Sequence, residues 1–338
     1  MKKIIVRSRQ NVFRHETEIL VNRYGFQEIN NGETSKGIKT RKELILFFLS
    51  DVLFVLRNIK KISRADVIIV TGFNALTIKL LIKLGIIKYK KLLWFGFFIH
   101  SDLAFKIFEI VLKVLSLKHE IMVLNAIYEI PLYAKRLGIP ERKLTYFKLG
   151  DWKKPVELFD PTYVPPFKDY CFAGGFTNRN YKTLIETFKE VDKNLIIVGS
   201  DLNEDLRDLD TLPNNIIVKK DIDKTEFESL VVHSSVCILP MKDPDAGASG
   251  HMVLLAYMRH KKIILASNFP AIREYLVHDK SAILYDDPKK DIPRILEDID
   301  LNKYDLNCLR DQAYKAYEEE FSAKALEENL VKIVESNL

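Results

Sequence analysis

A strand, a glycine turn, a helix and a second strand follow one another between Tyr170 and Asp201, and this order constrains the fold more than any other feature of the chain. Both strands are short apolar runs, and apolar residues recur at helical spacing between them. This succession predicts a βαβ unit of a parallel sheet, whose ligand-binding edge lies where the first strand ends.

The glycine turn of this unit has the residues of an anion site. Gly174 and Gly175 lack side chains, so a phosphate can approach the backbone, and Arg179 follows on the same loop. The free amides at the start of the next helix add positive potential. Because such turns are common, the turn alone leaves a purely structural role equally open. The predicted donor-binding residues here are Gly174, Gly175, Asn178, Arg179 and Asn180.

A second loop of the same kind ends at Gly250. It follows the apolar run Val236–Leu239 and precedes a helix that begins near His251. Ser249 can donate a hydroxyl hydrogen bond and His251 an imidazole one, and the helix N-terminus could hold the other part of a diphosphate. The predicted residues here are Ser249, Gly250, His251 and Met252.

The totals fit a globular protein of two domains. The chain has 338 residues, of which 47% are hydrophobic and 29% charged. Cys171, Cys237 and Cys308 lack metal-ligand spacing and predict buried thiols in a reducing compartment. The start MKKIIVRSRQ predicts a first strand rather than a secretory signal, and no apolar stretch reaches the roughly 20 residues that span a bilayer. We expect a cytoplasmic protein.

Strands and helices alternate on both sides of a proline-rich segment. This alternation predicts an α/β fold of two Rossmann-like, doubly wound domains that face a cleft. The expected domains are residues 1–150, a linker at 151–168 and residues 169–312, followed by helices at 313–338 that could pack back on the first domain. The predicted strands are 3–6, 67–70, 91–99 and 121–124 in the first half, and 170–173, 195–198, 216–218, 236–239, 263–266 and 282–284 in the second. The predicted helices of the first half are 16–23, 41–59, 103–117 and 128–137.

The second half resembles the C-terminal domain of GT-B glycosyltransferases of family 4. The resemblance rests on FAGG with its following Arg179, on LIIVGSD with Gly199, and on SGHMVLLAYMRHKKIILAS. It implies a hexosyltransferase that moves a sugar from a nucleoside diphosphate sugar to an acceptor hydroxyl, with retention of configuration. It also implies that residues 1–150 bind the acceptor, in cell-surface polysaccharide or glycolipid assembly, and that neither cofactor nor metal is needed.

One departure from the family concerns its pair of glutamates. Aligning the helix methionine with Met258 places Leu255 or Ala256 at the second position and Gly247 or Ala248 at the first. The pair is therefore missing, and Asp243 and Asp245 are open as substitutes or as solvated loop residues. The missing pair also favours an alternative, a catalytically silent protein that holds a nucleotide or a partner enzyme. A nucleotide-sugar epimerase is a third possibility.

Two sets of residues in the first half are candidates for the acceptor side. His100 and Asp102 follow an apolar run, where the resemblance places a cleft histidine; His100 could bond the donor and Asp102 could accept a proton. The alternative is that Asp102 only caps the next helix. Arg7 and Arg9 lie at the end of the first strand and suit a phosphate-bearing acceptor, although a solvated loop fits equally.

Charge is distributed unevenly along the chain. Residues 1–150 contain 27 Lys and Arg against 12 Asp and Glu, a net +15, whereas residues 151–338 contain 25 against 34, a net −9. Together with the apolar helices expected at 44–56 and 103–117, this charge predicts peripheral docking on the inner face of the membrane and a lipid-linked or glycan acceptor. The apolar residues could instead be core. Nucleic-acid binding lacks any recognisable motif.

Overall fold

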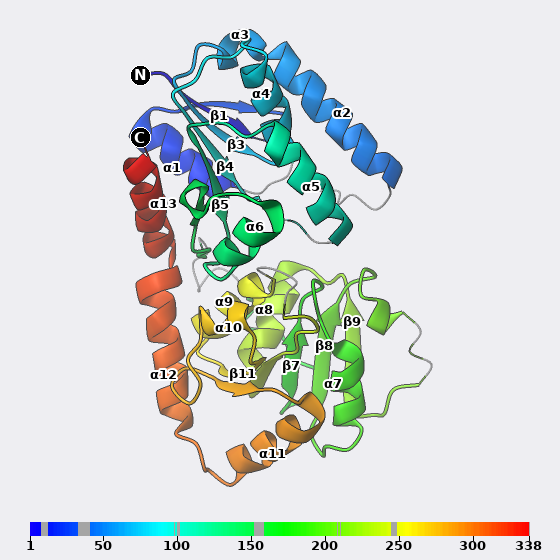
Figure 1. Ribbon diagram of the computed structural model, residues 1–338. Coiled ribbons are helices and arrows are strands. Elements are labelled where there is room, and N and C mark those ends of the chain that lie inside the picture. The colour runs from blue at the N-terminus through cyan, green and yellow to red at the C-terminus, as the bar shows by residue number, and fades with distance from the viewer. Residues whose placement is uncertain are drawn as a thin grey trace. The chain divides into compact units, whose positions relative to one another are not determined.

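A computed structural model describes residues 1–7, 13–32, 41–97, 99, 102–151, 159–207, 209, 211–244 and 249–337, without the side chains of 41–45 and 102–104 (Figure 1). The chain divides into two compact units, Met1–Lys148 with Glu327–Leu338 and Leu149–Leu326. Each unit is built on a six-stranded sheet whose paired strands all run parallel. The prediction of two Rossmann-like α/β domains is therefore confirmed.

The first unit has the sheet order β2-β1-β3-β4-β5-β6. Its central strand β3 is buried at every residue, as expected for a parallel sheet that is covered on both faces. The strands are β1 Lys3–Arg7, β2 Gln27–Asn30, β3 Val67–Thr71, β4 Lys91–Phe95, β5 Glu120–Leu124 and β6 Leu144–Tyr146. The helices are α1 Arg14–Tyr24, α2 Arg41–Arg57, α3 Ile59–Ile62, α4 Asn74–Lys83, α5 Asp102–Val114 and α6 Glu129–Leu137, with a 3-10 turn at Glu141–Lys143.

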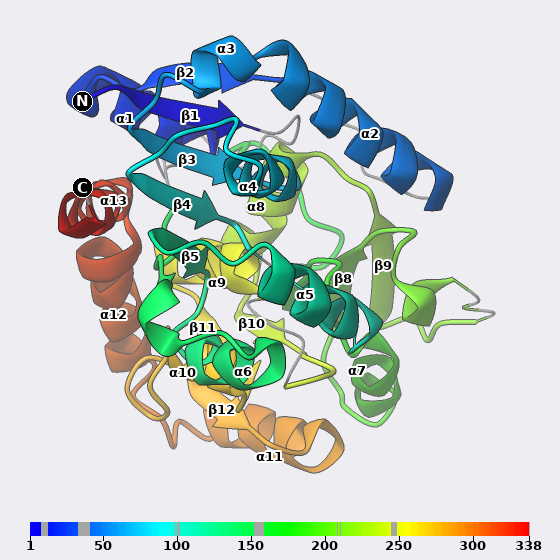
Figure 2. The same cartoon turned by 45° about the horizontal axis from the view of Figure 1, so that its top comes forward.

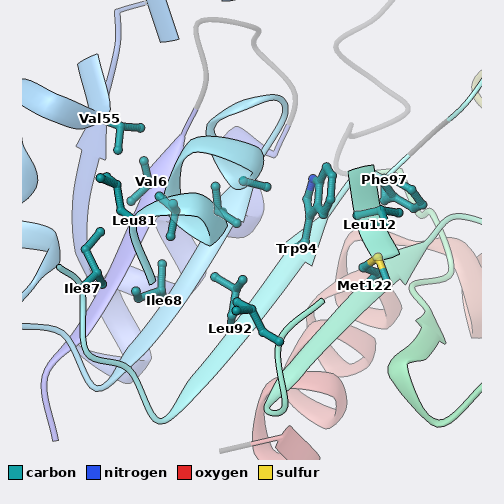
Figure 3. Packing of buried hydrophobic residues seen from close by; sticks show 14 of the residues in the cluster. Val6, Val55, Ile68, Leu81, Ile87, Leu92, Trp94, Phe97, Leu112 and Met122 are labelled. Carbon is teal, nitrogen blue, oxygen red and sulfur yellow. The ribbon is translucent and has the colours of Figure 1, made fainter. Parts of the chain in front are cut away.

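Helices α2 to α6 cover one face of this sheet. From β2 to β6 every crossover runs in the same direction across the sheet, and right-handed crossovers then place all connecting helices on the same side. One continuous core results, in which Val55 of α2 and Leu81 of α4 lie near Val6, and Leu112 of α5 lies near Trp94 (Figure 3). The only step in the other direction, from β1 to β2, carries α1.

The second unit has the order β12-β11-β10-β7-β8-β9. Its strands are β7 Cys171–Gly174, β8 Leu195–Gly199, β9 Ile216–Lys220, β10 Val236–Leu239, β11 Ile263–Ser267 and β12 Ile283–Tyr285. Its helices are α7 Tyr181–Phe188, α8 Lys224–His233, α9 His251–Arg259, α10 Pro270–Arg273, α11 Pro288–Asp300 and α12 Leu306–Ala316, with short turns at Glu204–Leu206 and Tyr317–Phe321. Helix α13, Ala323–Asn337, contributes its later part to the first unit.

Chain direction in the second sheet reverses between β7 and β10. After β9 the chain returns to start β10 on the other side of β7, so the loops that follow β7 and β10 emerge next to each other. This is the topological switch point at which open α/β sheets bind ligands. Two separate core clusters flank the sheet, one under α8, α9 and α12 and the other under α7 and α11.

Several predicted elements of the first unit need correction. The strand predicted over 91–99 ends at Phe95, because Gly96 has a left-handed φ of 66° and turns the chain out of the sheet. The helix predicted over 41–59 is divided into α2 and α3 at Asn58. Helix α5 begins and ends earlier than predicted, and β2, β6 and α4 were not predicted. Of the three thiols, Cys171 and Cys237 are buried as expected, whereas Cys308 is exposed.

Candidate functional site

The two loops that the sequence analysis singled out meet at the switch point of the second unit. Arg179 and Met241 form an isolated antiparallel bridge, which gives the loop after β7 and the loop after β10 a shared backbone ladder. The amide of Asn180 donates to the carbonyl of Pro240 (3.0 Å), and the amide of Lys242 donates to the carbonyl of Asn178 (3.3 Å). The predicted juxtaposition of these loops therefore occurs within one domain.

Asn178 fastens this junction with its side chain. Its amide nitrogen donates to the Asp243 carbonyl (2.8 Å) and to the Ser249 hydroxyl (3.2 Å). Its amide oxygen accepts from the Asp243 backbone (2.9 Å). The backbone of Asn178 has a φ of 56°, a left-handed conformation that Asn tolerates better than most residues. Asn178 thus holds the two loops in register.

Arg179 lies at the centre of the junction and is buried, with 5% of its surface exposed. Nε donates to the Gly174 carbonyl (2.9 Å) and Nη1 donates to the Thr177 carbonyl (2.5 Å). Among the residues that the structure describes, no carboxylate forms an ion pair with this guanidinium. A buried cation is stable only when it is paired or well hydrogen-bonded, so Arg179 offers an unneutralised charge to an anion.

The N-terminus of α9 lies against the same guanidinium. A β-carbon on Gly250 would lie 3.5 Å from Nη1 of Arg179, and one on Gly175 would lie 2.5 Å from Nη2. Leu254 is the first residue of the helix whose amide bonds to the turn before it. The preceding amides, at residues 251–253, have no hydrogen-bond partner within the described part of the chain. Arg179 and these amides together form a positive site at the start of α9.

The structure corrects the role predicted for the amides of the first glycine turn. The Gly174 amide donates to the hydroxyl of Tyr257 (3.0 Å), and the Gly175 amide donates to the carbonyl of Val198 (2.9 Å). Both donors are therefore occupied and do not face an anion. The reason for glycine here is space, because a β-carbon on Gly174 would lie 2.6 Å from the ring of Phe227.

The N-terminus of α7 is also unavailable, in contrast to the prediction. Asn180 caps it by accepting from the Thr183 amide (3.3 Å), and the carboxylate of Asp205 accepts from the Lys182 amide (3.2 Å). An anionic side chain of the protein thus already occupies this helix end. The positive site is formed by α9 and Arg179 and not by α7.

Two residues that support the first loop were missed in the sequence. The hydroxyl of Tyr181 lies 2.5 Å from the Gly175 carbonyl oxygen and 3.2 Å from that of Val198. Asn203 accepts from the Ser200 amide (3.0 Å) and donates to the Phe176 carbonyl (2.8 Å). Asn side chains commonly bond to nearby loop backbone, and this tendency could have pointed to Asn203, which follows the turn after Gly199.

His251, the first residue of α9, has its ring stacked on Tyr275, with centroids 4.4 Å apart. It is buried, and neither ring nitrogen has a hydrogen-bond partner in the part of the chain that the structure describes. Burial lowers the pKa of His251 to about 4, the charge of Arg179 acts in the same direction, and the backbone of Ala271 opposes the shift. His251 is therefore neutral at physiological pH.

The remaining predicted site residues divide into two groups. His100, Arg9, Asp245, Gly247 and Ala248 lie outside the described residues. The structure does place Arg7, Asp102, Ser249, Met252, Leu255 and Ala256.

Arg7 and Asp102 belong to the first unit. Arg7 is buried at the end of β1, where its Nε lies 2.9 Å from Oε1 of Glu28. Asp102 is the first residue of α5, and its side chain is not described. The acceptor role of Arg7 and the site role of Asp102 stay predictions.

The second unit contains the other four residues of this group. Ser249 is buried, whereas Met252 is exposed. Leu255 and Ala256, one of which the sequence analysis aligned with the second family glutamate, are buried on the core side of α9. This stretch of α9 consequently offers no carboxylate.

Comparison with known proteins identifies the domain that contains this site. Residues 168–298 match the family of Glycosyl transferases group 1. The second unit belongs to the group 1 glycosyl transferases. No functionally curated protein matches the chain in sequence.

Solved structures extend the likeness of the group 1 domain to both units. A glycosyltransferase from Rickettsia africae has 15% sequence identity and a TM-score of 0.67, with 99% of this chain and 98% of that one covered. HepE of Anabaena in complex with UDP-glucose has 12% identity and a TM-score of 0.67, with coverage of 99% and 100%. Sucrose-phosphate synthase from Thermosynechococcus elongatus has 12% identity and a TM-score of 0.73, with 99% of both chains covered. At these identities the comparison shows the fold, which is GT-B.

Proposed function

We propose that the group 1 domain binds a nucleoside diphosphate sugar with its diphosphate at Arg179 and the start of α9, and that the chain transfers the sugar to an acceptor hydroxyl. The observation that carries the proposal is the buried guanidinium of Arg179, which lies against the start of α9. In the described residues it has no ion pair with a carboxylate, and the amides at residues 251–253 have no hydrogen-bond partner there either. A diphosphate supplies the missing negative charge and the missing acceptors.

The same arrangement suits the leaving step of glycosyl transfer. When the bond from the anomeric carbon to the phosphate oxygen breaks, negative charge grows on the diphosphate. Arg179 and the amides at residues 251–253 are already oriented by the loop junction, so little reorganisation is needed as the charge develops. Asn178, which fastens the junction, acts as a positioning residue. The proposal includes retention of anomeric configuration and needs no metal.

A UDP-sugar is the donor to be tested first, because HepE of Anabaena, a structural neighbour, was solved with UDP-glucose. The sugar itself is left open in the proposal. In the alignment on Met258, Leu255 or Ala256 takes the place of the second family glutamate, and Gly247 or Ala248 that of the first. Asp243 donates its backbone amide to the Asn178 side chain. Asp243 and Asp245 are the proposed carboxylates near the sugar.

The first unit is proposed to bind the acceptor, which is a lipid-linked or glycan hydroxyl in polysaccharide or glycolipid assembly. His100 and Asp102 are the proposed residues near the reacting hydroxyl, with Arg7 and Arg9 for an acceptor phosphate. Because Arg7 already lies beside Glu28, Arg9 is the better first target for mutation.

Nucleotide release tests the proposal directly. The protein is incubated with a panel of UDP-sugars and a membrane extract, and released UDP and sugar-modified product are measured by mass spectrometry. Arg179→Lys keeps the charge but loses the fork of donors, and the loss of such a stabilising donor lowers turnover by about a hundredfold. Arg294→Ala, at an exposed arginine of α11, is the control and should retain activity. Unchanged UDP affinity and turnover in Arg179→Lys would contradict the proposal.

A catalytically silent nucleotide-binding protein is the second candidate, favoured by the apolar residues Leu255 and Ala256 in place of a glutamate. It predicts that UDP binds and raises the melting temperature while no donor is consumed. An epimerase would convert the donor without any acceptor present.

A further inference from the structure

Helix α2 is apolar on its outer side as well as on its inner side. Its inner side chains Phe54 and Val55 are buried in the core of the first unit. The outer side presents four leucines, which are 44 to 56% exposed and recur at steps of three and four residues, so that they line one face. These are Leu46, Leu49, Leu53 and Leu56. A helix that is apolar all round is usually buried, so the exposed leucines of α2 indicate a surface that another molecule covers.

The exposed apolar surface continues over the neighbouring helices. Helix α5 exposes Ile107, Ile110 and Val114 at helical spacing, between 52 and 67% each. Helix α4 exposes Leu80, and Leu84, directly after its last residue, is exposed too. All three helices cover the same face of the sheet, and α4 lies between α2 and α5 in both views (Figures 1 and 2). We call the exposed residues of α2, α4 and α5 the apolar face.

This gathering is specific to the first unit. Among the described residues, the second unit also exposes large apolar side chains, but they lie singly: Val164, Phe176, Leu202, Val277 and Leu301 outside helices, and Met252 on α9. Scattered apolar residues are normal on a surface, whereas a patch that extends over three helices marks an interaction site.

Positive charge accompanies the apolar face. Arg57 ends α2, Lys83 ends α4, Lys88 follows in the next turn and Lys106 lies on α5; all four are exposed. None of them forms an ion pair in the described residues. The whole stretch 1–150 carries a net charge of +15, which favours an anionic partner.

We propose that the apolar face docks on the surface of a bilayer that contains anionic lipid. The leucines and isoleucines would enter the boundary between headgroups and acyl chains while the basic residues contact lipid phosphates. A second copy of the chain fits less well, because a two-fold contact would bring each basic face against its own copy. Among the helices that the structure describes, none is long and apolar enough to cross a membrane. Docking at the surface requires no crossing.

Vesicle sedimentation provides the test. The protein is mixed with vesicles of phosphatidylcholine and phosphatidylglycerol, and with vesicles of phosphatidylcholine alone. We expect binding to the mixed vesicles that weakens as salt is raised. Leu49→Gln with Leu53→Gln should lower the partition coefficient by about tenfold or more, because each leucine that enters the bilayer contributes the transfer free energy of one buried apolar side chain. Val164→Gln with Leu202→Gln, at isolated exposed positions, is the matched control and should bind as the parental protein does.

Further measurements separate this proposal from its competitors. Because the substituted leucines are about half exposed, thermal denaturation should show the double variant folded. Arg179→Lys should bind vesicles normally, so a failure of the proposed transferase activity leaves the docking test intact. Vesicle binding that is unchanged in the leucine variant would overturn the proposal. The proposal would also be overturned if the parental protein does not bind vesicles and instead forms a dimer in sedimentation velocity. Binding to duplex oligonucleotide without binding to vesicles would overturn it as well.

Discussion

The side chain of Asn178 holds the two loops of the proposed diphosphate site together, and its removal has a calculable effect. Asn178→Gly deletes three hydrogen bonds to Asp243 and Ser249 while tolerating the φ of 56°. At 0.5 to 1 kcal/mol for each partly exposed bond, we expect a loss of about 2 kcal/mol. Asn178→Ala adds a β-carbon in the left-handed region, which costs about 1 kcal/mol more.

Differential scanning calorimetry measures this loss. For a domain of this size, about 2 kcal/mol lowers the melting temperature by roughly 4 to 8 °C, and the alanine variant should melt lower still. Asn302 is the matched control, because it has a φ of 55° and no side-chain hydrogen bond in the described residues. Asn302→Gly should be neutral and Asn302→Ala should show only the backbone cost.

The same variants test the link to binding. With the loops no longer joined, UDP affinity measured by isothermal titration should fall about tenfold, which corresponds to the loss of about 1.4 kcal/mol, roughly one hydrogen bond to a charged group. If Asn178→Gly melts and binds UDP like the parental protein, the junction does not organise the site and the reasoning is refuted.

Three further predictions follow from the second unit. Because the folded-state pKa of His251 is about 4 and its ordinary value is 6.5, the unfolding free energy should be constant above pH 6.5 and fall by about 3 kcal/mol as the pH drops to 4; His251→Phe should abolish this dependence in pH-resolved denaturation. Gly199→Ala places a β-carbon 2.4 Å from Leu206 and should cost about 1 to 3 kcal/mol. Because Leu206→Ala removes that clash but also a buried side chain, melting experiments on the double variant should show a loss smaller than the sum of the two single losses. UDP should slow hydrogen exchange at residues 149–151, because His251 stacks on Tyr275, Tyr275 stacks on Phe321, and the Phe321 carbonyl accepts from the Asp151 amide. Tyr275→Leu should reduce that effect; equal protection in both proteins would contradict this path.

The sequence predicts the second unit well because each of its strands is a short apolar run that a glycine, proline or polar turn ends. The first unit is predicted less completely. Strand β2 has the sequence QEIN, an edge strand with one buried residue, and β6 has only three residues. Neither offers the alternation or length that separates a strand from a loop. The apolar run that contains β4 continues beyond Gly96, so the sequence predicts a strand that ends four residues after the observed end at Phe95.

Residues of the site are predicted by type but not by hydrogen bonding. Arg179 and the start of α9 come together as expected, because the strand order places their loops at one switch point. That Asp205 already occupies the start of α7 could not be foreseen, since its side chain arrives from a turn 23 residues further along the chain. The occupied amides of Gly174 and Gly175 likewise depend on tertiary contacts.

Helix α9 connects the proposed diphosphate site to the place where the chain enters and leaves the second unit. At its start, the His251 ring stacks on Tyr275, which stacks in turn on Phe321, both with centroids 4.4 Å apart. At its end, Arg259 pairs with Asp151, whose amide donates to the Phe321 carbonyl (2.6 Å). The two ends of α9 are thus linked to two hydrogen-bonded residues, Asp151 and Phe321, which lie near the two points where the chain passes between the units. Because packed rings and a buried ion pair resist gradual deformation, we expect a ligand that moves α9 to change the protection of the backbone at residues 149–151.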